Sequence, residues 1–136
     1  MEVINFHNWV YYVGEDADKL EEHKSGKWMY FFDNIDFASR ICQEAVETGV
    51  VVEAKHSDDL TGVCCFYLNG DNMDPHRKTI QFFLKHDLIR KTAKGKLYNI
   101  SFKYNYQTRA KEYGAQFQSE IKLDRFLNLE TGEWKF

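Results

Sequence analysis

The chain has 136 residues, of which 43% are hydrophobic and 16% aromatic, and its formal net charge is −3. This length suits one domain, and the aromatic content excludes an intrinsically disordered chain. No stretch reaches the roughly 20 apolar residues that a membrane span needs, and the first residues do not resemble a signal peptide. We therefore expect a single cytoplasmic domain over residues 1–136, without a membrane partner.

The small net charge hides an uneven distribution. Residues 1–75 carry 5 basic and 15 acidic side chains, whereas residues 76–111 carry 10 basic side chains and one acidic, Asp87. Such a concentrated basic segment can create a local positive field whatever the net charge.

Patterning predicts four strands and one helix in the first half of the chain. The strands are expected at residues 3–13, 26–32, 50–55 and 62–68, and a polar loop or short helix at residues 14–25. Apolar residues at helical spacing predict a helix that starts at a cap, Asp33 or Asn34, and runs to about Thr48, with Gly49 as its stop. The short link between the last two strands favours an antiparallel hairpin.

The second half predicts another helix and two more strands. Asp74 is expected to cap this helix, with Pro75 as its first residue. Strands are expected at residues 96–103 and 117–123, a polar loop at 107–113 and a helical turn at 124–127. Strands joined by short hairpins, with helices on one face, predict an α+β fold with a mainly antiparallel sheet.

Short motifs carry a resemblance to a known fold. The second predicted strand opens with Ser25-Gly26-Lys27-Trp28, and the next two contain Gly49–Lys55 and Gly62–Tyr67. This succession resembles the cap-binding translation initiation factors of the 4E type. Ala54-Lys55-His56-Ser57 and the stretch from Thr108 to Tyr113 are similar to the 4E-like basophilic-leukaemia-expressed family. The resemblance covers roughly residues 25–115 and implies a curved, mainly antiparallel sheet with two or three helices packed on one face.

The same comparison bears on the ligand. Cap-binding factors hold a methylated guanine between two tryptophans, but residues 14–25, the loop that would supply one of them, contain none here. Trp28 matches a structural tryptophan of the family, which leaves Trp9 as the candidate to stack on a base. Lys55 lies near the place where those factors set basic residues against phosphates. The resemblance thus implies the fold and a phosphorylated ligand rather than the mRNA cap.

The residues that we predict to bind a ligand lie mainly at strand ends and in loops. They are Trp9, Lys55, His56, Arg90, Lys96, Tyr98, Thr108, Arg109 and Tyr113. Cationic side chains attract phosphates, and aromatic rings stack on bases. We therefore expect a basic, aromatic-lined pocket for a nucleotide, a nucleotide-derived signal or an RNA end, formed by residues distant in sequence.

Two other functions remain open. An enzyme acting on a phosphorylated substrate could use Lys55 and His56 as an acid–base pair, and a small regulator could bind a protein partner through residues 14–24. Phosphate-loop and nucleophile motifs are absent, and no histidine or cysteine spacing suits a metal, so we expect no catalytic residue, cofactor or metal. The five histidines are expected at the surface or at helix caps, and the three cysteines as buried thiols.

Overall fold

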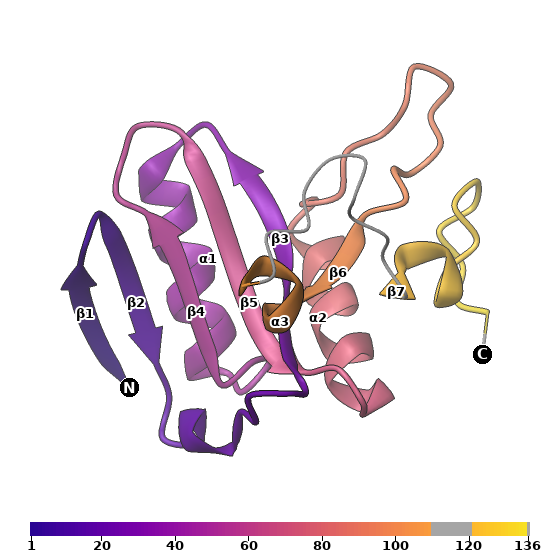
Figure 1. Ribbon diagram of the computed structural model, residues 1–136. Coiled ribbons are helices and arrows are strands. Elements are labelled where there is room, and N and C mark those ends of the chain that lie inside the picture. The colour runs from indigo at the N-terminus through magenta and orange to yellow at the C-terminus, as the bar shows by residue number, and fades with distance from the viewer. Residues whose placement is uncertain (110–120, 136) are drawn as a thin grey trace.

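The computed structural model describes residues 1–109 and 121–135, without the side chains of residues 108 and 109 (Figure 1). Its strands are β1 (Glu2–Phe6), β2 (Trp9–Val13), β3 (Ser25–Phe32), β4 (Glu53–Ser57), β5 (Gly62–Asn69), β6 (Ser101–Tyr104) and β7 (Ile121–Lys122). Its helices are α1 (Ile35–Glu47), α2 (Met73–Lys85) and α3 (Asn105–Arg109), and short 3-10 turns form at η1 (Ala17–Lys19) and η3 (Leu123–Arg125). The strands pair antiparallel in the order β1-β2-β4-β5-β3-β6-β7, which confirms the predicted α+β class.

The curved, unclosed sheet has two different faces. Helices α1 and α2 cover its back face, whereas the short α3 lies in front of β5 (Figure 1). The core fills the space between the back face and the two longer helices, where Trp28, Phe66 and Phe83 are at most 1% exposed. We call the opposite side, which faces the viewer in Figure 1, the front face.

Residues 3–13 form a hairpin, not the single strand that the sequence predicted. His7 and Asn8 link β1 to β2, and both have positive φ, at 49° and 67°. This combination is typical of a type I′ turn, which joins strands through two residues. The turn escaped prediction because the usual Asn-Gly or Asp-Gly signal is absent.

The longer helices begin at asparagine caps. Asn34 Oδ1 accepts a hydrogen bond from the Phe37 N–H at 3.1 Å at the start of α1, which confirms the predicted helix. For α2 the predicted cap, Asp74, is wrong. Asn72 caps this helix by accepting from the Asp74 N–H at 3.1 Å, and Pro75 then lies within the first turn, where its missing N–H is tolerated.

Three other boundaries differ from prediction. The strand expected at 50–55 starts only at Glu53, because the N–H groups of Val50 and Val51 bond back to Ala45 O at the end of α1. Of the strand expected at 96–103 only β6 forms, because Lys96 closes a turn with Thr92 and the next two residues, Leu97 and Tyr98, pair back with residues 90–91. The first residues of the loop expected at 107–113 belong instead to helix α3, which runs to Arg109. The start of the strand expected at 117–123 lies outside the described residues, whereas η3 confirms part of the expected helical turn.

Two histidines lie in the core, contrary to the predicted surface or capping positions. His76 on α2 is fully buried, and its Nδ1 accepts a hydrogen bond from Trp28 Nε1 at 3.0 Å. Its Nε2 lies 2.9 Å from Gly70 O, so this nitrogen carries the proton and donates it. Burial lowers the pKa of His76, which favours this neutral form. The second core histidine, His56, is described with the site.

The cysteines are buried and free, as predicted. None of the helices in the described part of the chain combines the length and apolar composition of a bilayer span.

Candidate ligand site on the front face of the sheet

An ammonium group and three aromatic rings meet on the front face of β2, β4 and β5. Lys55 Nζ lies 3.8 Å from the centroid of the Trp9 ring, 5.4 Å from that of Tyr11 and 6.0 Å from that of Tyr67. Rings at these distances attract a cation through their negative faces. We call these four residues the front-face cluster. It unites Trp9 and Lys55, two predicted ligand-binding residues that are distant in sequence.

Strand register explains how the cluster forms. Tyr11 pairs with Lys55, and Lys55 pairs on its other side with Cys65. Paired side chains on neighbouring strands point to the same face, and residues two apart on one strand share that face. Trp9 therefore lies beside Tyr11, and Tyr67 lies beside Cys65.

The charge of Lys55 has no carboxylate partner among the described residues, because none of their carboxylate oxygens lies within 4.0 Å of its Nζ. The nearest acid along β4 is Glu53, whose pKa is raised by burial although Lys55 opposes the shift. Aromatic rings thus occupy the place that a counterion would usually take. An anion that approached Lys55 would meet an ammonium group that forms no ion pair with the described part of the chain.

Further lysines continue the cationic character toward β6. Lys27 and Lys103 pair across β3 and β6, and they are only 9% and 7% exposed. Lys27 Nζ lies 5.9 Å from the Tyr67 ring and donates to Asn105 Oδ1 at 3.2 Å. Tyr67 therefore lies about 6 Å from two ammonium groups. Burial raises the pKa of its hydroxyl, which keeps the group protonated and able to donate a hydrogen bond.

His56 lies on the other side of the sheet from Lys55. It is 2% exposed, its Nε2 lies 3.2 Å from the Tyr12 hydroxyl, and its Nδ1 lies 2.9 Å from Ser57 O. Alternation along β4 turns this ring into the core, where both nitrogens have partners. Lys55 and His56 therefore cannot contact one substrate together, which removes the geometric basis for an acid–base pair.

The other predicted site residues do not join the cluster. Arg90 and Tyr98 line a separate hollow of about 420 Å³ beside β3, where Arg90 Nη2 donates to Phe31 O at 3.2 Å. Lys96 lies in another depression, with Asp124 and Glu130. The structure thus distributes these basic residues over several places and does not gather them around one pocket. The side chains of Thr108 and Arg109 and the whole of Tyr113 lie outside the described residues.

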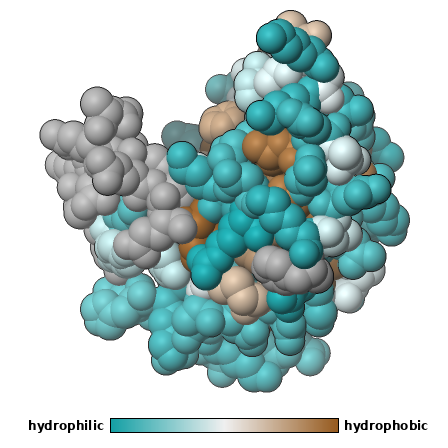
Figure 2. All heavy atoms as spheres, turned by 90° about the vertical axis from the view of Figure 1, so that its right-hand side faces the viewer, coloured by the Kyte–Doolittle hydropathy of each residue, from teal (hydrophilic) through white to brown (hydrophobic). Residues whose placement is uncertain are grey.

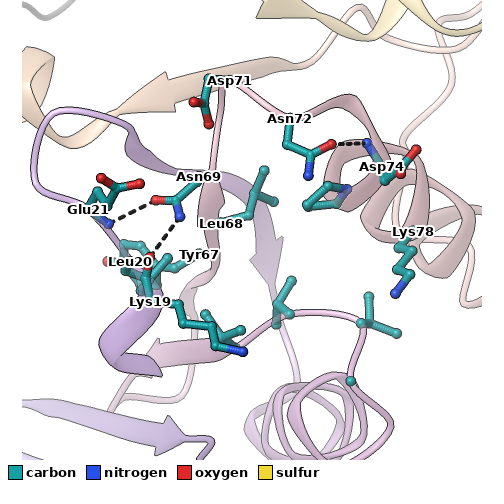
Figure 3. Close-up of a pocket in the computed structure, with 15 residues that line it drawn as sticks. Lys19, Leu20, Glu21, Tyr67, Leu68, Asn69, Asp71, Asn72, Asp74 and Lys78 are labelled. Atoms are coloured by element: carbon teal, nitrogen blue, oxygen red, sulfur yellow. Dashed lines mark hydrogen bonds between the residues drawn. The ribbon is translucent and has the colours of Figure 1, made fainter. Parts of the chain in front are cut away.

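A cavity of about 520 Å³ opens between η1, the end of β5, α2 and the segment 49–52 that follows α1 (Figure 3). Asn69 fixes one side of it, because its Oδ1 accepts from the Glu21 N–H at 2.9 Å and its Nδ2 donates to Lys19 O at 2.8 Å. Lys19 and Lys78 line the cavity from different elements. Lys19 is paired with Asp16, whereas Lys78 forms no ion pair with the described residues. Its lining also includes the carboxylates of Glu21, Asp71 and Asp74. This cavity is a second hollow that a binding experiment has to separate from the front-face cluster.

Comparisons with known proteins identify no relative. No protein-family model, curated protein or solved structure matches the chain. The resemblance to the 4E type therefore rests on its short sequence motifs alone.

Sequence reasoning missed Tyr11, Tyr67, Lys27 and Lys103 as neighbours of the site. The alternation of Trp9 and Tyr11 on one strand was a usable signal for a shared face. The sequence contains no comparable signal for the pairing of β2 with β4, because these strands are separated by β3 and α1 in the chain.

Proposed function

We propose that the protein is a non-enzymatic module that binds a nucleotide or the end of a single-stranded RNA on the front face of its sheet. The observation that carries this proposal is the front-face cluster, in which the Lys55 ammonium group has no carboxylate partner among the described residues and lies 3.8 Å from the centroid of the Trp9 ring. Ammonium groups bind phosphates, and base–aromatic stacking contributes about 1–3 kcal/mol per base. Cation and ring are thus close enough to serve one nucleotide.

The arrangement suggests how the ligand lies. A phosphate bound to Lys55 leaves the base within reach of Trp9 or Tyr11 on the neighbouring strand. Sheet faces with aromatic and cationic side chains suit unstacked bases of single-stranded RNA.

Isothermal calorimetry with mononucleotides and short single-stranded RNAs tests this proposal. We expect Lys55→Ala to weaken binding by about tenfold or more, because a charge-assisted contact contributes about 1.5–3 kcal/mol. We expect Trp9→Ala to weaken it by about 5- to 150-fold through lost stacking. Affinity should also fall steeply with salt.

Two matched lysine variants make the result specific. Lys94→Ala removes the same charge at the exposed turn before Gly95 and should leave the affinity within about twofold. Lys78→Ala removes the lysine that α2 contributes to the 520 Å³ cavity, where Lys19 is paired with Asp16. If Lys78→Ala weakens binding and Lys55→Ala does not, the ligand occupies that cavity and the front-face proposal is wrong. The proposal also fails if no anionic ligand binds at low salt.

A further inference from the structure

Exposed apolar side chains concentrate on the terminal strand β1. Of the nine large hydrophobic residues that are exposed in the described part of the chain, four lie within the first six positions: Met1, Val3, Ile4 and Phe6, at 42%, 52%, 42% and 58%. All five residues of β1 are exposed. The opposite end of the sheet is different, because the side near β7 is mostly hydrophilic, with only small hydrophobic patches (Figure 2).

The hairpin geometry shows which backbone groups of β1 are available. Phe6 pairs with Trp9 around a two-residue turn, and the residues next to such a turn exchange hydrogen bonds. Hydrogen-bonded pairs then alternate along the ladder, so the N–H and C=O groups of Glu2, Ile4 and Phe6 point toward β2. Those of Val3 and Asn5 point outward, where the described residues offer them no backbone partner.

We propose that β1 is the interface of a homodimer, in which it pairs antiparallel with β1 of a second copy. A two-fold axis at Ile4 places Val3 opposite Asn5 of the second copy, and Asn5 opposite Val3 of the second copy. Each of these pairs exchanges two hydrogen bonds through the outward backbone groups. The sheet of one copy continues into the sheet of the other.

The backbone and the side chains of β1 both favour a second copy of this chain as the partner of the edge. An antiparallel edge is complementary to itself about a two-fold axis, as an isologous interface requires. Ile4 packs against Ile4 of the second copy, and the only charged residue, Glu2, lies opposite Phe6 and far from the other Glu2. The strand carries no lysine, proline or bulge, the devices that usually keep an edge from pairing.

The dimer also leaves the front-face cluster available. Trp9 and Tyr11 belong to β2, one strand in from the interface, and Ile4 pairs with Tyr11. Each copy therefore presents its cluster close to the two-fold axis on a shared sheet face. The interface itself rests on β1 and does not depend on the proposed ligand.

Light scattering coupled to size exclusion, together with sedimentation velocity over a range of concentrations, tests the dimer. We expect the mass of two copies for the natural chain. Asn5→Pro removes an outward N–H without removing a hydrogen bond of the β1–β2 ladder, so this variant should be a folded monomer. Ile4→Lys places two ammonium groups together at the axis and should also yield a monomer. Leu60→Lys, which changes a 78% exposed residue at the β4–β5 turn, should remain a dimer.

Two outcomes overturn the proposal. One is a natural chain that stays monomeric up to about 1 mM. The other is a dimer that persists in the Ile4→Lys variant. Circular dichroism shows whether this variant is folded. If Asn5→Pro does not fold, the mass of Ile4→Lys alone tests the dimer. Nucleotide binding measured on the same samples separates this interface from the proposed function.

Discussion

His76→Ala should lower the free energy of unfolding by about 3–5 kcal/mol. The substitution leaves Trp28 Nε1–H without its acceptor and Gly70 O without its donor, and both groups lie in the core. It also opens a cavity beside the rings of Phe102 and Phe126, whose centroids lie 4.7 and 5.5 Å from that of His76. Urea unfolding followed by tryptophan fluorescence measures the change.

Two variants show whether the hydrogen bonds are responsible. His23→Ala changes an exposed histidine and should alter the free energy of unfolding by less than about 0.5 kcal/mol. His76→Gln can still accept from one side and donate to the other, so it should recover part of the loss. A loss below about 1 kcal/mol for His76→Ala would show that this network contributes little.

The same histidine gives stability a pH dependence of known sign. Because burial lowers the pKa of His76 below its usual value of 6.5, the unfolded chain binds the extra proton first. The contribution of His76 to the free energy of unfolding is therefore complete above about pH 6.5. It is lost as the pH falls toward the pKa that His76 has in the folded chain. The stability difference between the natural chain and His76→Gln should shrink on acidification, and a constant difference between pH 7 and pH 5 would contradict this account.

Gly26→Ala should destabilise the protein by about 3 kcal/mol or more. A Cβ at this position would lie 2.5 Å from the Phe102 ring and 2.6 Å from Lys103 O. The second contact is with the backbone of the paired strand, which cannot yield without separating β3 from β6. The free energy of unfolding from urea titration reports the effect.

A second glycine provides the contrast. Gly49 ends α1 with φ of 74°, and a Cβ there would meet nothing within 4 Å. Gly49→Ala should therefore cost only the conformational strain, about 1 kcal/mol. Equal losses at the two glycines would mean that the close packing of β3 on β6 is not what requires Gly26. That packing also positions two lysines near the site, because Lys27 on β3 pairs with Lys103 on β6.

Local signals predicted the parts of the fold that local forces determine. The stripe of Ala38, Ile41, Cys42 and Ala45 and the cap at Asn34 specify α1 wherever it packs. The same holds for β3 and β5, which are bounded by turns. The β1–β2 turn was missed because left-handed conformations at His7 and Asn8 are imposed by the pairing of the strands around them.

The candidate site depends on contacts that no local pattern contains. Trp9 and Lys55 were predicted individually, but their contact follows from the pairing of strands that are not consecutive in the chain. The expected convergence of Arg90 and Lys96 with Lys55 rested on charge alone, and charge does not determine which side chains share a hollow. His76 was placed at the surface because its polarity was weighed without the indole that it accepts from.

The indole N–H resonances of the three tryptophans test the central claim most directly. Trp9 lies in the front-face cluster, Trp28 is in the core, and Trp134 is 39% exposed near the end of the described chain. Titration of 15N-labelled protein with a nucleoside triphosphate and with a short single-stranded RNA should shift the Trp9 signal and leave the Trp28 and Trp134 signals in place, with assignments from single tryptophan-to-phenylalanine variants. A Trp9 signal that stays fixed with both titrants, or one that stays fixed while Trp134 shifts, would contradict ligand binding at the front face.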